Sequence, residues 1–95
     1  MDDMVKRASS KNGRVRHSVA IEPTCPLNLL LQLAGDSEYY VKKAVARHPA
    51  LTLDMVKDNM QVFYDFKLEW FDRHPDLDFA YKAKEFIENH RDQVC

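Results

Sequence analysis

Leu33 to Thr52 read LAGDSEYYVKKAVARHPALT, and the end of this segment recurs along the chain at a fixed interval. Pro49 has counterparts 26 residues away on either side, at Pro23 and Pro75. Around Pro49 and Pro75 the match extends over the five residues Arg-His-Pro-x-Leu. A fixed period of about 20 to 50 residues is typical of proteins built from stacked repeats. The sequence therefore predicts three units, at about residues 14–35, 36–60 and 61–95.

Each unit is predicted to contain a helix, a corner marked by the proline, and a second short helix. In the central unit, Asp36 and Ser37 are candidates for the N-cap of the first helix. The apolar stripe of that helix follows the spacing i, i+3, i+4 and consists of Val41, Ala44 and Val45. The helix is expected to end near His48, because a proline disfavours the helical conformation of the residue before it.

The second helix of the central unit is expected to begin near Thr52, whose hydroxyl is suited to an N-cap. Leu53, Val56 and Met60 would then point toward the interior. In the first unit, Gly35 is expected to end the second helix in the left-handed conformation. Helices this short are not stable alone in water, so neighbouring units must cover their apolar stripes.

The repeated pattern is V-(K/R)-x-x-V-A-x-x-P, followed by an apolar segment that ends in L-A-x-D. It resembles the leucine-rich repeat variant, a helical relative of the HEAT-type repeats. The first unit carries it as Val15-Arg16, Val19-Ala20, Pro23, Leu30, Leu33-Ala34 and Asp36, and the second as Val41-Lys42, Val45-Ala46, Pro49 and Val56. The resemblance implies an all-α, right-handed alpha-alpha superhelix, a short solenoid of three helical repeats of about 26 residues, in which α-helices alternate with short 3₁₀-type helices.

The third unit departs from the pattern and is rich in aromatic residues. Residues 61–74 contain no glycine or proline, and their large side chains have helical spacing, which predicts one longer helix. A last helix is expected after Pro75, capped by Asp76 or Asp78, with inward positions at Phe79, Ala83, Phe86 and Ile87. The aromatic residues are interpreted either as core that closes the stack or as a binding patch that includes Phe63, Tyr64, Trp70 and Tyr81.

Length and composition indicate one domain at residues 14–95 after a flexible lead-in at residues 1–13. Of the 95 residues, 45% are apolar and 31% are charged, as in ordinary globular proteins. The amino end lacks the layout of a secretory signal and no apolar run is long enough to span a membrane, so a cytoplasmic protein is expected. Cys25 is expected to be a small, partly buried corner residue, and Cys95 to be solvated.

No catalytic, cofactor or metal site is predicted. His48 and His74 hold equivalent places at helix ends, where positive groups bond carbonyl oxygens, and one repeat separates them, which is too far to share a zinc ion. HExxH, CxxC, Walker and GxSxG motifs do not occur in the sequence. The chain is therefore expected not to be an enzyme.

The charge distribution and leftover aromatic residues favour a small protein–protein interaction module, an adaptor or inhibitor. Residues 1–50 carry a net charge of +3 and residues 51–95 carry −4. A basic stripe is expected where Arg16 aligns with Lys42 and His17 with Lys43, flanked by Arg47. The predicted contact residues are Arg14, Arg16, Tyr39, Tyr40, Lys42, Lys43, Tyr64 and Trp70.

Two alternatives remain open. The basic stripe also suits an accessory protein that binds nucleic acid through phosphate contacts, although the pI of about 6.4 is low for such a protein. The opposite charges of the two halves suit self-association end to end, positive on negative.

Overall fold

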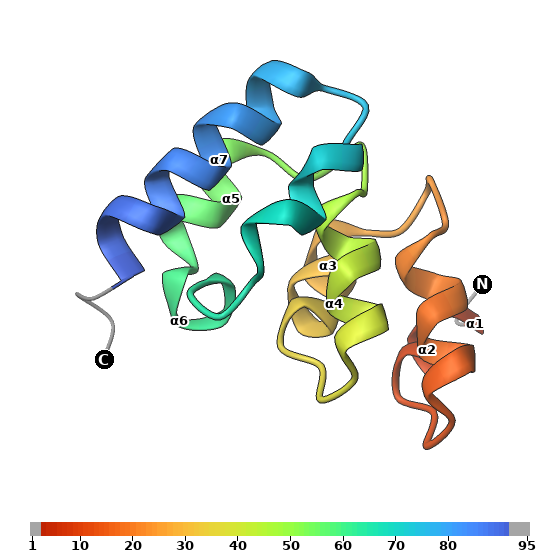
Figure 1. Ribbon diagram of the computed structural model, residues 1–95. Coiled ribbons are helices and arrows are strands. Elements are labelled where there is room, and N and C mark those ends of the chain that lie inside the picture. The colour runs from red at the N-terminus through yellow and green to blue at the C-terminus, as the bar shows by residue number, and fades with distance from the viewer. Residues whose placement is uncertain (1–2, 92–95) are drawn as a thin grey trace.

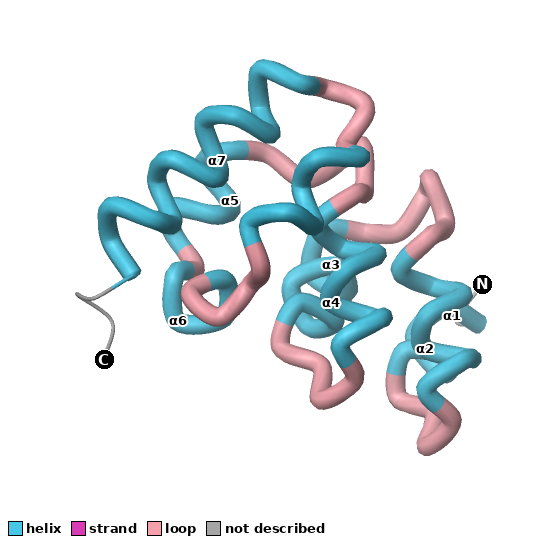
Figure 2. Tube along the Cα trace, viewed as in Figure 1, coloured by secondary structure: helices cyan, strands magenta, loops and turns pink. Residues whose placement is uncertain are grey.

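The structure, a computed structural model, describes residues 3–91, where helices are joined by turns and loops and no strand occurs (Figures 1 and 2). The prediction of an all-α protein is confirmed. The helices are α1 (Asp3–Ala8), α2 (Gly13–Ala20), α3 (Leu27–Ala34), α4 (Tyr39–Ala46), α5 (Leu53–Asp58), α6 (Met60–Phe63), the 3₁₀ helix η1 (Leu68–Arg73) and α7 (Leu77–His90).

The helices follow one another along an elongated molecule with extents of 37 × 28 × 20 Å. Helices α1 and α2 lie at one end, and α7 lies at the other (Figure 1). Between these ends, α2 packs against α4, α4 against η1, and η1 against α7. Helix α3 packs against α4, and α5 packs against α7. The segment expected to be a flexible lead-in contains α1, which packs against α2 and α3.

Side-chain caps begin three of the helices. The side-chain amide oxygen of Asn12 accepts from the Arg14 N–H, the Thr52 hydroxyl accepts from the Met55 N–H, and the Asp76 carboxylate accepts from the Phe79 N–H. The predicted caps at Thr52 and Asp76 are therefore confirmed.

The start of α4 differs from the prediction. Glu38 is its N-cap residue and makes no capping bond with its side chain. The Asp36 carboxylate accepts a hydrogen bond from the Glu38 N–H in the turn before α4, and it also forms an ion pair with Arg16. Gly35 ends α3 as its C-cap residue, as predicted, but the predicted left-handed conformation is wrong: its φ is −95°, and its N–H bonds the Gln32 carbonyl oxygen.

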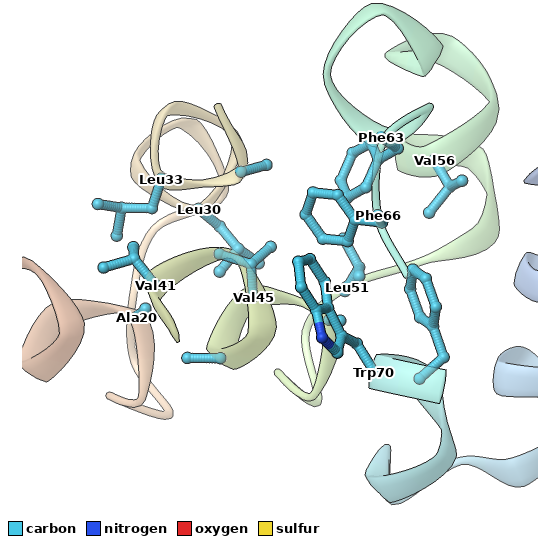
Figure 3. Close-up of a cluster of buried hydrophobic side chains, with 14 of the residues drawn as sticks. Ala20, Leu30, Leu33, Val41, Val45, Leu51, Val56, Phe63, Phe66 and Trp70 are labelled. Atoms are coloured by element: carbon cyan, nitrogen blue, oxygen red, sulfur yellow. The ribbon is translucent and has the colours of Figure 1, made fainter. Parts of the chain in front are cut away.

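The core runs the length of the molecule and changes composition on the way. Small and aliphatic side chains fill it between α2, α3 and α4, and aromatic rings fill it around α6 and η1. Figure 3 shows the two groups facing each other, with Leu30, Leu33, Val41 and Val45 on one side and Phe63, Phe66 and Trp70 on the other. The inward positions predicted for α7 are buried at Phe79, Ala83 and Ile87, and Phe86 is partly buried.

The single long helix predicted for residues 61–74 is wrong. Helix α6 ends at Phe63, Lys67 has an extended backbone, and η1 begins at Leu68. This break lets the Phe66 ring contact Phe71, with ring centroids 5.9 Å apart, as well as Phe63 and Trp70. Side chains five residues apart do not face each other on one continuous helix, so the broken chain buries this aromatic cluster more completely.

The two equivalent histidines form hydrogen bonds that repeat at the interval seen in the sequence. The Nε2 atom of His48 lies 2.6 Å from the Glu22 carbonyl oxygen, and that of His74 lies 2.8 Å from the His48 carbonyl oxygen. Each Nδ1 atom accepts a backbone N–H, from Ala50 in one case and from Asp76 in the other. We call this arrangement the histidine ladder.

The hydrogen bonds of the ladder determine which nitrogen of each ring carries the proton. Because each Nδ1 atom is an acceptor, the proton lies on Nε2 and the imidazole is neutral. Both side chains are buried, at 2% exposure for His48 and 3% for His74. The prediction that these residues act as positive groups at helix ends is thus wrong, although they do bond carbonyl oxygens as expected. Burial also lowers the pKa of His74.

Candidate partner-binding groove

A groove of about 350 Å³ lies between α2 and α4, the first helices of the first two predicted units. The two helices contribute one wall each, and the corner after α4 closes one end. Residues that line the groove are His17, Ala20, Ile21, Tyr40, Lys43, Ala44, Arg47, His48 and Pro49. We call this feature the α2–α4 groove.

The cationic wall of the groove comes from α4. Lys43 and Arg47 lie four residues apart, so they share one side of the helix end. Neither side chain makes an ion pair within residues 3–91, and the Nε atom of Arg47 is buried without a hydrogen-bond partner there. Both are partly buried. The groove therefore has positive charge that the described part of the chain does not balance.

The opposite wall and the floor are apolar or aromatic. Ala20 and Ala44 are buried at the base, whereas Ile21 stays 57% exposed at the end of α2. The rings of His17 and Tyr40 meet edge to face, with centroids 5.9 Å apart. A partner that fills this groove can bury aliphatic surface on Ile21 and meet positive charge on the facing wall.

Two cations of the predicted stripe form ion pairs with carboxylates of the same chain. Arg16 makes a two-pronged ion pair with Asp36, with the Nε–Oδ2 distance at 2.6 Å and the Nη2–Oδ1 distance at 3.1 Å. It also donates to the Ser10 carbonyl oxygen. Lys42, the equivalent residue 26 positions later, pairs with Asp65 at 2.8 Å. These side chains tie a first helix to a later turn, so their charge is balanced locally.

Tyr40 connects the groove to a neighbouring hollow that Arg14, His17 and Tyr39 complete. Tyr39 stands 65% exposed and packs its ring edge against Tyr40. The phenol of Tyr40 lies directly against Gly13, where a Cβ atom would overlap its hydroxyl oxygen. The absence of a side chain at position 13 therefore allows Tyr40 to occupy this place.

The remaining predicted contact residues lie elsewhere. Trp70 is 7% exposed and packs against Phe66 in the core, and Tyr64 is partly buried after α6. Neither lines the groove. Of the predicted set, Tyr40 and Lys43 line it, and Arg14 and Tyr39 border the adjoining hollow.

Ile21 and Pro49 were not among the predicted contact residues. An exposed isoleucine beside a proline corner carries no distinctive sequence signal, because single exposed apolar residues are common. Arg47 was predicted only as a flank of the stripe. Its spacing of four residues from Lys43 was the available indication that the two cations act together.

Cys25 is buried at the first corner, as expected, and this burial raises the pKa of its thiol. The position of Cys95 falls outside the described residues. Within residues 3–91, no three histidine, cysteine or acidic side chains are grouped as a metal site would require. In the same range, no helix combines the length and apolar character needed to cross a membrane.

Comparisons with protein-family models, curated proteins and solved structures found no match to this chain.

Proposed function

We propose that this chain is a short solenoid of helical repeats that acts as a non-catalytic protein–protein interaction module, an adaptor or inhibitor. The 26-residue interval of the histidine ladder supports the repeat interpretation, as do Arg16 and Lys42, which are 26 residues apart and each pair with an aspartate later in the chain. A right-handed superhelix like that of the leucine-rich repeat variant accommodates both. Stacked repeats commonly use an extended surface to bind other proteins.

The unbalanced positive charge of the α2–α4 groove is the observation that carries this proposal. Arg16 and Lys42 are matched by acidic residues of the same chain, whereas Lys43 and Arg47 face the groove with no ion-pair partner among residues 3–91. Arginine and tyrosine are also enriched at the energetic centres of protein interfaces. The groove is thus suited to a protein segment that presents carboxylates beside an apolar side chain.

The two halves of the groove have distinct roles in binding. Arg47 and Lys43 would donate charge-assisted hydrogen bonds, which are stronger than neutral ones, to the carboxylates of the partner. Ile21 and Pro49 would bury apolar surface, which contributes about 25 cal/mol per Å² removed from water. The charges also speed the encounter with an acidic partner.

Nucleic-acid binding is the second candidate, and it is supported by three cations on this side that make no ion pair in the described part of the chain, Arg14, Lys43 and Arg47. The pairing of Arg16 and Lys42 with aspartates weakens it, because those two cations already have carboxylate partners. Fewer phosphate contacts give a weaker complex and a shallower dependence of binding on salt.

A capture experiment separates these functions. Tagged wild-type protein, the groove variant Lys43→Gln with Arg47→Gln, and the control Lys6→Gln with Lys11→Gln are each incubated with lysate of the source organism. The control removes two exposed cations outside the groove. Nuclease-treated and untreated lysates are compared.

We expect the wild type and the control to retain one defined protein after nuclease treatment. The groove variant is expected to lose that protein. Retention of the same protein by all three chains would contradict the role of the groove. Recovery of nucleic acid alone, lost as salt rises, would replace the proposal with the second candidate.

A further inference from the structure

We propose that a second copy of this chain docks into the α2–α4 groove through the outer face of α7, so that copies assemble head to tail. The inference rests on the proposed function in one respect, since it uses the same groove. It adds the identity of one occupant and the surface with which that occupant binds.

The outer face of α7 carries Tyr81, Glu85 and Glu88, which lie at positions i, i+4 and i+7 and therefore point to the same side. All three are exposed, Tyr81 at 64%. With η1 they border a shallow hollow lined by Leu68, Glu69, Asp72, Tyr81, Lys84, Glu85 and Glu88. We call Tyr81, Glu85 and Glu88 the α7 face.

The α7 face has negative charge that its own neighbours do not balance. Lys84 pairs with Asp72, which removes the one cation of the hollow. Glu69, Glu85 and Glu88 make no ion pair within residues 3–91. An aromatic ring beside unpaired carboxylates is the counterpart of the groove, where an aliphatic side chain lies beside unpaired cations.

The spacing of the charges also matches. Glu85 and Glu88 are three residues apart on their helix, about 4.5 Å along its axis, and Lys43 and Arg47 are four apart, about 6 Å. The flexible stems of lysine and arginine cover the difference. When these pairs meet, Tyr81 lies one helical turn away, where its ring can cover exposed Ile21. An amphipathic helix laid in a groove is a common mode of protein recognition.

The two surfaces belong to different ends of an elongated molecule (Figure 1). A contact between unlike surfaces leaves one groove and one α7 face free on every pair, so such an assembly grows rather than closing as a symmetric dimer. The charges make the contact sensitive to salt, because the Debye length falls from about 30 Å at 0.01 M salt to about 8 Å at 0.15 M.

Sedimentation velocity with two neutralised variants tests this inference. The groove variant is Lys43→Gln with Arg47→Gln, and the face variant is Glu85→Gln with Glu88→Gln. Asp58→Asn, which neutralises an exposed acidic residue on α5 outside both surfaces, is the control. Concentrations extend to about 1 mM at low salt so that weak association is detected.

The wild type and the control are expected to form species larger than a dimer at low salt and to dissociate as salt rises. Each variant alone should associate at least about tenfold more weakly. A mixture of the two variants should form a 1:1 pair and nothing larger, because only one intact groove and one intact face remain between them.

A wild-type chain that stays monomeric at the highest concentration and low salt overturns the inference. Association that neither variant weakens overturns it too, since another surface would then be responsible. The face variant keeps its groove, so its capture of a partner from lysate tests the proposed function separately from self-association.

Discussion

The hydroxyl of Tyr40 rests against Gly13 at a place where any larger residue would overlap it. Gly13 has no positive φ, so its backbone does not require glycine. Its role is the close approach of a neighbouring ring, which in turn holds Tyr40 between His17 and Tyr39 at the groove. The lack of a Cβ atom at Gly13 therefore determines where Tyr40 lies at the groove.

Gly13→Ala is expected to destabilise the protein by about 1 kcal/mol. Overpacking typically costs about 1–3 kcal/mol, and the better helix propensity of alanine offsets part of that cost. The free energy of unfolding from urea titrations measures the change. The same substitution in a Tyr40→Phe background should cost less, because the overlapping oxygen is gone. An equal cost in both backgrounds would show that Tyr40 is not the cause.

The two ion pairs at equivalent positions differ in burial and should differ in importance. The side chains of Arg16 and Asp36 are 15% and 7% exposed, whereas that of Asp65 is 42% exposed. Asp65→Ala is expected to change stability by no more than about 1 kcal/mol, as is usual for exposed pairs. Asp36→Ala should lower the melting temperature clearly more, because Asp36 also accepts the Glu38 N–H. Equal melting temperatures for the two variants would refute this order.

At the scale of elements, the histidine ladder joins three successive corners through backbone carbonyl groups. His74 is covered by the Phe79 ring, with centroids 4.5 Å apart, so α7 seals the last member of the ladder from water. Protonation of either ring would place a hydrogen on Nδ1, opposite a backbone N–H. The corners therefore depend on neutral histidine.

The stability of the protein should consequently fall in mild acid. Burial lowers the pKa of His74 below its ordinary value of about 6.5, so the unfolded chain binds more protons in this range. The contribution of His74 is thus complete above about pH 6.5 and is lost as the pH falls through its lower, folded value. Urea titrations between about pH 7.5 and pH 5 measure the slope.

His74→Gln is the control for this pH dependence. It keeps a side-chain amide and removes the titrating group, so its stability should fall less steeply over the same pH range than that of the wild type. Parallel slopes for the two proteins would exclude His74 as the source. The two proteins differ only at position 74, so a difference between their slopes reports on His74.

The sequence predicted the positions of these elements better than their contacts. The repeated Arg-His-Pro identified both histidines as equivalent, but their acceptors are main-chain carbonyl groups, which every residue carries. The 26-residue interval predicted that Arg16 and Lys42 occupy equivalent positions. It did not predict their aspartate partners, which lie 20 and 23 residues away in turns of different length. The break after Phe63 was missed because neither glycine nor proline marks it.

At the scale of the whole molecule, the core is continuous from α2 to α7, and the aromatic cluster joins its two parts. Trp70 lies at this junction, since its helix η1 packs against α4 and its ring meets that of Phe66 (Figure 3). Such a placement couples the stability of the N-terminal helices to that of the C-terminal ones.

Trp70→Ala is expected to cost about 3–5 kcal/mol, a large share of the 5–15 kcal/mol typical of a domain. Far-UV circular dichroism should show one cooperative transition at a lower temperature, since both parts of the core lose their shared contact. Trp70→Phe, which keeps most of the apolar volume, should retain more stability. Two separate transitions in Trp70→Ala would instead indicate halves that fold independently.

The histidine ladder also makes the chain extensible. His48 both donates to the corner before it and offers its own carbonyl oxygen to His74. A second copy of residues 23–48, inserted after His48, would bring one new donor and one new acceptor in the same register. Growth of such an array by gene duplication therefore needs no new kind of contact, and the length of the protein becomes a variable that selection can adjust in steps of one repeat.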